Sequence, residues 1–192
     1  WLGEFSPGEK FAQQPALNYK GSLASPGYSY PYFGGACTYC VVPPEVMELG
    51  CLLHYSGESY FEASLGEPMS CVVGGYRGNY HTSRHSHEHV MGVREGGSVL
   101  ILGGCGPMGL EAIEYPMTLE KKPAMIVVTD LSEERIARAR RLIPESLAAA
   151  RGIRLVYINS GECSDEFAEL MALTGGRGYD DIFVYNPLRS LA

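Results

Sequence analysis

The sequence has no long apolar run and little positive charge. No apolar stretch among its 192 residues approaches the roughly 20 that are needed to span a bilayer, which argues against a membrane role. Its 15 Lys and Arg residues stand against 22 Asp and Glu residues, and the formal net charge of −7 would repel nucleic-acid phosphates unless a local basic face offset it. We therefore expect neither a membrane nor a nucleic acid as a partner.

The number of cysteines is low for a disulfide-stabilised domain. The six cysteines are too few and too irregularly placed for the disulfide framework of a small secreted domain, so we expect mostly reduced thiols in a cytoplasmic protein. Cys37 and Cys40 have the spacing of half a zinc site or of a redox pair, but no second pair follows, and an ordinary strand is the alternative. The chain begins with Trp1 and no charged-then-apolar leader follows, so we expect a fragment without a secretion signal.

The first 95 residues predict part of a small β-rich domain. Residues 1 to about 35 are rich in Gly, Pro, Ser and Tyr, which is typical of loops and short strands. Residues 37–46 carry β-forming side chains and predict a strand that ends at a proline pair. Residues 57–80 predict a helix in part, because their apolar side chains recur at helical spacing. We expect this helix to cross to a second domain, with a boundary near residue 95.

From residue 96 the pattern becomes a regular alternation of strands and helices. The predicted strands are 98–102, 124–129, 154–158 and 181–185, and the predicted helices begin at about 108 or span 133–142 and 165–173. Apolar strands separated by amphipathic helices indicate a parallel sheet that is covered on both faces. Residues 96–192 therefore predict an α/β domain of the doubly wound Rossmann type, incomplete at its C-terminus. Pro116 should end or kink the first helix near Tyr115.

The strongest local signal is a glycine-rich turn between the first of these strands and the helix that follows it. The turn has the pattern G-x-G-x-x-G and consists of Gly104, Cys105, Gly106, Pro107, Met108 and Gly109. In a dinucleotide-binding domain the first glycine permits the tight turn, the second lets the backbone approach a pyrophosphate, and the third lets the helix pack closely. The helix N-terminus adds N–H donors and a partial positive charge. We therefore expect this turn to hold the phosphates of a nicotinamide cofactor.

Three residues outside the turn complete the predicted cofactor site. Asp130, at the end of the second strand, is placed to accept hydrogen bonds from the adenosine ribose, which favours NAD over NADP. Arg135 could still reach a 2′-phosphate, so NADP stays open. Tyr185 follows the last predicted strand, at the edge where ligands of open α/β sheets lie. Two other classes of protein share such a turn: a methyltransferase that uses S-adenosylmethionine, and a non-catalytic protein whose glycines serve cofactor binding or packing alone.

Histidines form a second cluster, at positions 81, 85, 87 and 89. A spacing of four would place His81 and His85 on one helical face, whereas alternate residues from His85 to His89 would line one face of a strand. The simpler hypothesis is a polar surface connection between the crossing helix and the next strand. The alternative is a loop that contacts substrate, with Arg84 as an anchor for a phosphorylated sugar.

The segment from Glu67 to Cys71, the glycine-rich turn and Asp130 together resemble the medium-chain, zinc-type alcohol and polyol dehydrogenases, and most closely their members of the sorbitol-dehydrogenase and sorbose-phosphate-reductase type. The resemblance implies a GroES-like catalytic domain ahead of a Rossmann domain. It also implies an enzyme that transfers hydride between NAD(P) and a polyol, sugar alcohol or sugar phosphate, with zinc assistance and as a homo-oligomer. Glu67 falls on the family's zinc-site carboxylate, so it is the candidate catalytic residue and metal ligand.

The chain departs from this family in its other zinc ligands. The first zinc-ligand cysteine and the Gly-His-Glu motif of the family are absent, and a catalytic zinc ion normally takes three protein ligands. The lobe that holds a structural zinc ion in many members contains no cysteine here, at residues 13–34, so we expect no structural zinc. The chain alone is therefore expected to bind a cofactor and to be catalytically silent.

Overall fold

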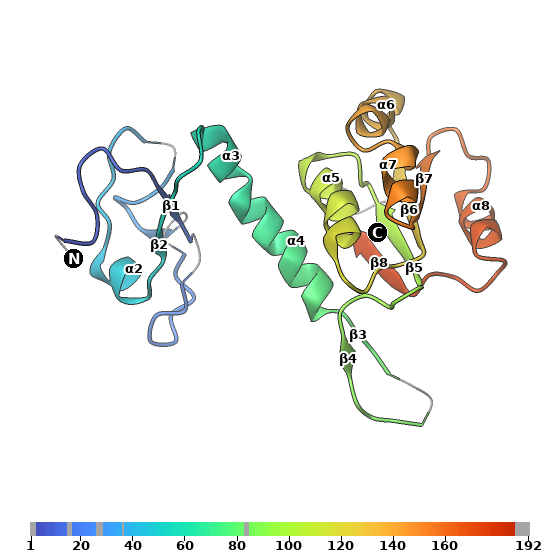
Figure 1. The fold of residues 1–192 in the computed structure, drawn as a ribbon, viewed down its shortest axis with the longest axis horizontal. Coiled ribbons are helices and arrows are strands. Elements are labelled where there is room, and N and C mark those ends of the chain that lie inside the picture. Colours follow the sequence, from blue (N-terminus) through green and yellow to red (C-terminus); the bar gives the residue numbers. More distant parts are fainter. Residues whose placement is uncertain (1–2, 15–16, 26–28, 36, 83–84, 187–192) are drawn as a thin grey trace. The chain divides into compact units, whose positions relative to one another are not determined.

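The computed structural model describes residues 3–14, 17–25, 29–35, 37–82 and 85–186 (Figure 1). The chain divides into two compact units, Trp1–Glu67 and Pro68–Ala192. Each unit is described by itself below. Within the described ranges every helix is too short or too polar to span a lipid bilayer.

The first unit has little regular structure. It contains an antiparallel pair of strands, β1 (Phe11–Gln13) and β2 (Leu52–His54), and two short helices, α2 (Pro44–Glu48) and α3 (Tyr60–Ser64). Leu17, Phe33 and Val46 form its small buried core. The strand predicted over residues 37–46 is wrong: residues 37–43 form no strand, and Pro44 begins α2. Proline suits the first position of a helix, because its fixed φ fits the helix and its missing N–H has no partner there.

The second unit is built on a parallel four-stranded sheet. Its strands are β5 (Ser98–Leu102), β6 (Met125–Asp130), β7 (Arg154–Asn159) and β8 (Asp181–Val184). They lie in the order β7-β6-β5-β8, and each neighbouring pair is parallel. The first strand of this sheet in the sequence, β5, thus lies in its interior, and later strands flank it on both sides. This arrangement is Rossmann-like, and it confirms the parallel α/β architecture that the sequence predicts.

Helices cover both faces of this sheet, as predicted. They are α4 (Gly66–Gly78), α5 (Pro107–Glu114), α6 (Glu133–Leu142), α7 (Glu145–Ala150) and α8 (Glu166–Leu173). Alternation along β5 assigns the faces: Val99 and Ile101 join one buried cluster with residues of α4, α5, α6 and α7. Leu100 points to the opposite face, where it shares a second cluster with Leu170 of α8.

Local signals explain where these helices begin and end. Helix α5 gives way to a 3-10 turn over Tyr115–Thr118, which confirms the effect expected of Pro116. The Ser132 side chain accepts a hydrogen bond from Arg135 N and so caps α6, and Asp165 caps α8 in the same way. Helix α7 was not expected from the sequence.

Residues between Pro68 and the sheet pack on the sheet unit. Tyr76 of α4 is buried, its hydroxyl donates to the Ala112 carbonyl (2.7 Å), and its ring stacks on Phe183 with centroids 4.2 Å apart. The short strands β3 (Tyr80–His81) and β4 (Val90–Met91) then form an antiparallel hairpin. Along the chain, the division between the two compact units falls between residues 67 and 68, whereas the sequence pattern suggests a boundary near 95.

Candidate functional site

The glycine-rich turn joins β5 to α5 through a tightly packed backbone. Gly103, directly before the turn, has a φ of 67°, a conformation that favours glycine. A Cβ on Gly104 would lie 2.6 Å from Val128 Cγ1, and a Cβ on Gly109 would run into the Gly104 backbone. A Cβ on Gly106 would meet no protein atom within 4 Å. Protein atoms thus leave no room for a side chain at Gly104 and Gly109, whereas the turn is open at Gly106, where a side chain would meet free space.

Helix α5 presents its N-terminus at this open position. Gly106 is the N-cap and Pro107 the first helical residue, and no side chain caps the helix there. The first backbone hydrogen bond of the helix runs from Leu110 N to Gly106 O (2.9 Å). The N–H groups of Met108 and Gly109 precede this bond, so they are donors of the kind that bind anions at helix N-termini.

Asp130 lies at the end of β6 and holds the turn in place. The residue is 6% exposed, and the two oxygens of its carboxylate accept hydrogen bonds from Cys105 N (3.2 Å) and Ser132 N (3.1 Å). Each oxygen of an ionised carboxylate has two acceptor sites, so each can still accept from a ligand. Asp130 therefore has a structural task in addition to its predicted contact with a ribose.

Cys105 contributes its backbone to the site. Its side chain is fully buried, and burial, followed by the nearby Asp130 charge, raises the pKa of the thiol to about 12. A thiol with this pKa stays protonated at neutral pH and is a poor nucleophile. The Cys105 carbonyl accepts a hydrogen bond from Arg138 Nη2 (2.9 Å), so both polar backbone groups of Cys105 are held by side chains.

A cavity of about 640 Å³ begins beside the turn and extends over the sheet face next to α8. Three predicted residues, Asp130, Arg135 and Tyr185, line it together with Gly103. Its remaining lining combines apolar side chains with polar groups, and the members that follow strand ends are Leu131, Ser160 and Asn186. The sequence did not single out Leu131 and Ser160, although each stands just after a strand of a parallel sheet, where ligand-binding residues concentrate.

Glu67, the predicted zinc ligand, belongs to no cluster of metal-ligating side chains among the described residues. It is exposed, in the first turn of α4, and is the last residue of the first unit. Among the residues that the structure describes, no three His, Cys, Asp or Glu side chains gather as a metal site requires. The described residues therefore do not fit a zinc ion, and Cys37 and Cys40 are free thiols.

The histidines separate into different environments. His81 Nε2 lies 3.1 Å from Asp181 Oδ1, and the His89 ring stacks on Tyr80 with centroids 4.1 Å apart. His85 and His87 lie between β3 and β4. The candidate anion anchor Arg84 lies outside the described residues. This segment is a hairpin connection, which agrees with the simpler of the two hypotheses for it.

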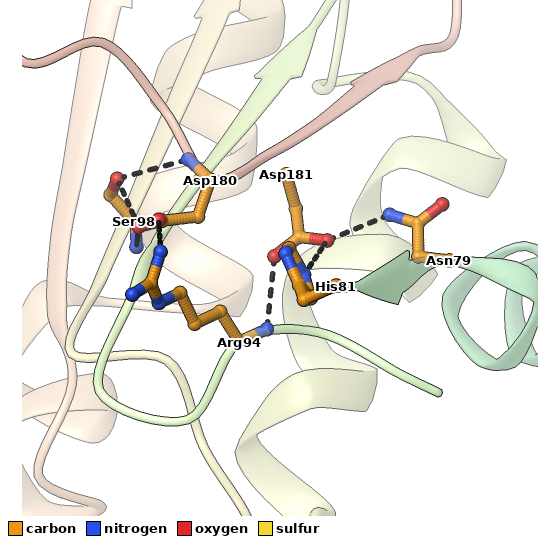
Figure 2. Close-up of polar contacts among 6 residues, drawn as sticks. All are labelled: Asn79, His81, Arg94, Ser98, Asp180 and Asp181. Atoms are coloured by element: carbon orange, nitrogen blue, oxygen red, sulfur yellow. Dashed lines mark hydrogen bonds and ion pairs between the residues drawn. The ribbon is translucent and has the colours of Figure 1, made fainter. Parts of the chain in front are cut away.

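A second polar cluster lies where β8 begins (Figure 2). Because β5 and β8 are parallel, this cluster lies at their amino-terminal ends, whereas the turn follows the carboxyl end of β5. Asp181 is 3% exposed and accepts hydrogen bonds from Asn79 Nδ2 (2.8 Å) and Arg94 N (3.1 Å), besides its contact with His81. Asp180 accepts from Ser98 N (2.8 Å) and pairs with the Arg94 guanidinium (3.1 Å). The two carboxylates connect the hairpin segment to β5 and β8.

The parallel sheet and its glycine-rich turn define a Rossmann-like class of fold. A solved structure supports this class: the crystal structure of AibC matches 94% of this chain and 49% of its own length, with a TM-score of 0.54 and 18% sequence identity. At that identity the likeness concerns the fold alone. No family model matches the sequence.

Sequence relatives give a more particular result. Mannitol-1-phosphate 5-dehydrogenase of Aliivibrio fischeri is 46% identical over 182 residues, and L-sorbose 1-phosphate reductase of Klebsiella pneumoniae is 42% identical over 191. The Escherichia coli protein named uncharacterized protein YggP is 45% identical over 183 residues. The matches cover 95–100% of this chain but only 43–45% of each relative. The chain thus spans less than half the length of these relatives.

Proposed function

We propose that this chain contains the cofactor-binding part of an NAD(P)-dependent oxidoreductase that acts on a polyol or sugar phosphate. The observation that carries the proposal is the glycine-rich turn, open at Gly106, beside a cavity lined by Asp130 and Arg135. The names of two relatives, a mannitol-1-phosphate dehydrogenase and a sorbose 1-phosphate reductase, support the reaction and the substrate class. Because the chain covers less than half of these relatives, the substrate is proposed for the whole protein.

The residues of the turn suit a dinucleotide. The open space at Gly106 lets a pyrophosphate approach the backbone, and the Met108 and Gly109 N–H groups can donate to it. The remaining acceptor sites of Asp130 can bind ribose hydroxyls, and Arg135 and Tyr185 border the same cavity. When bound, the cofactor supplies the nicotinamide that accepts or donates hydride. The residues of this chain bind and orient it.

We propose NAD as the preferred cofactor, because a carboxylate at the end of the second strand disfavours a 2′-phosphate. Arg135 lines the cavity together with Asp130, so a contact with the 2′-phosphate of NADP is the competing hypothesis. Titration with both cofactors decides between them.

The zinc-type, medium-chain assignment and a GroES-like first domain remain proposals that rest on the resemblance. In them Glu67 is one catalytic-site carboxylate of a zinc site whose other ligands lie outside the described residues. The cytoplasmic location and the homo-oligomeric state likewise remain predictions.

The proposal is tested by calorimetric titration of the chain with NADH, NADPH and S-adenosylmethionine in parallel. We expect binding of NADH with a Kd in the micromolar range, and weaker binding of NADPH. Absence of nicotinamide binding by a chain that is folded by circular dichroism would refute the proposal. Binding of S-adenosylmethionine instead would assign the turn to a methyltransferase.

A further inference from the structure

Helix α6 contributes a side chain to the glycine-rich turn that none of the predicted roles includes. Arg138 Nη2 donates a hydrogen bond to the Cys105 carbonyl at 2.9 Å, across 33 positions of sequence. The N–H of Cys105 in turn donates a hydrogen bond to the Asp130 carboxylate at 3.2 Å. The middle of the turn is thus fixed between the end of β6 and the next helix.

The direction of the Cys105 carbonyl determines the direction of the amide that follows it. All peptide bonds of the described residues are trans, and in a trans peptide the C=O and the next N–H point to opposite sides. With its carbonyl turned to Arg138, the 105–106 peptide directs the Gly106 N–H away from α6. Gly106 is also the position where an added Cβ would meet open space.

Positive charge from α6 reaches the turn as well. The guanidinium groups of Arg138, Arg140 and Arg135 partly oppose the effect of burial on the pKa of Cys105. The protein as a whole is acidic, with a net charge of −7, so these three arginines bring positive charge near the turn of an otherwise acidic chain. A pyrophosphate is an anion that such a field attracts.

We propose that Arg138 is a positioning residue for the cofactor: it holds the Cys105 carbonyl so that the amide groups of the turn face the pyrophosphate. The inference rests on the proposed function, because it assigns the residue a role only if a dinucleotide binds. The positioning role predicts that affinity for phosphate-bearing ligands depends on the hydrogen bond from Arg138 to the Cys105 carbonyl and not on the charge of Arg138 alone.

Three substitutions separate the hydrogen bond from the charge. Arg138→Met removes both, Arg138→Gln keeps an N–H donor without charge, and Arg138→Lys keeps a charged donor. Arg141→Met is the matched control, since Arg141 is exposed on the same helix and carries the same charge. The affinities of NADH and ADP-ribose are measured by calorimetry, and that of adenosine, which has no phosphate, by ligand-observed NMR.

We expect Arg138→Met to weaken NADH and ADP-ribose about tenfold, the size of one charge-assisted hydrogen bond, and to leave adenosine affinity within about twofold. Arg138→Gln and Arg138→Lys should each recover most of the loss, and Arg141→Met should bind as the wild type does. Equal loss for adenosine and ADP-ribose would overturn the positioning role, because a general loss of structure affects both ligands.

Two other results would also overturn it. The first is unchanged NADH affinity in Arg138→Met. The second is recovery in Arg138→Lys without recovery in Arg138→Gln, which would assign the effect to charge alone. If Arg138→Met does not fold, the comparison of Arg138→Gln with Arg138→Lys still decides between hydrogen bond and charge. Failure of the wild-type chain to bind NADH would instead refute the proposed function, so the two outcomes are distinguishable.

Discussion

Two buried aspartates stand at opposite ends of the parallel strands of the same sheet and use similar chemistry for different purposes. Asp130, at the end of β6, accepts hydrogen bonds from N–H groups of the glycine-rich turn and of the start of α6, and it borders the cavity beside the turn. Asp181, at the start of β8, accepts from Asn79, His81 and Arg94, all in the segment between α4 and β5. The comparison teaches that a buried carboxylate takes its role from its donors. One organises the glycine-rich turn, and the other attaches a hairpin.

The largest expected effect comes from removing the carboxylate that serves structure alone. Asp181→Ala should lower the free energy of unfolding by about 3 kcal/mol, because it leaves buried donors without an acceptor. The affinity for NADH should stay within about twofold of the wild type. Urea denaturation and calorimetry measure the two quantities. Asp180→Ala is the neighbouring control and should cost about 1 kcal/mol, since Asp180 is more exposed. A large loss of affinity in a folded Asp181→Ala chain would break the comparison.

The next effect concerns the carboxylate at the turn. Asp130→Asn keeps one oxygen acceptor and loses the other, so it should cost about 1–2 kcal/mol of stability and also weaken NADH about tenfold. Asp165→Asn is the matched control: aspartate and asparagine are about equally good N-cap residues, so α8 and cofactor binding should be unaffected. If Asp130→Asn lowered stability without changing affinity, Asp130 would be a second purely structural carboxylate.

The smallest expected effect is a dependence of stability on pH at the β8 edge. Burial raises the pKa of Asp180, but its hydrogen bonds with Ser98 and the Arg94 guanidinium more than offset this, so the pKa lies below the ordinary value of 3.8. Folding favours the ionised carboxylate of Asp180. Its contribution to the free energy of unfolding is therefore complete above the ordinary pKa and is lost as the pH falls below it. On acidification through this range, the free energy of unfolding should fall more for the wild type than for Asp180→Asn. The difference should be less than about 1 kcal/mol. Identical acid profiles of the two proteins would exclude the contribution.

The sheet unit could be predicted from the sequence because its strands are continuous apolar runs bounded by turn residues. The strand over Ser98–Leu102 and the helix over Glu133–Leu142 have the predicted bounds, and Pro116 acts as expected. Around Pro44 the β-forming residues misled the prediction, because one proline at a helix start outweighs a local propensity. The first unit offers no comparable apolar periodicity.

The candidate site was predictable only where a motif fixes local geometry. The turn and Asp130 follow a known spacing, but the hydrogen bond from Arg138 to Cys105 joins residues 33 positions apart and depends on how α6 packs. The donors of Asp181 are more distant still, up to 102 positions away. Such contacts arise from tertiary packing, which no short pattern encodes.

The central claim is that a dinucleotide lies against the open side of the turn, and Gly106→Leu tests it most directly. Gly106 has a φ of −81°, which any residue can adopt, and its added side chain would meet no protein atom at Cβ. Gly74→Ala, on an exposed part of α4, is the control. Calorimetric titration with NADH should find binding abolished in Gly106→Leu and unchanged in Gly74→Ala, with both chains folded. Wild-type affinity in Gly106→Leu would contradict the account.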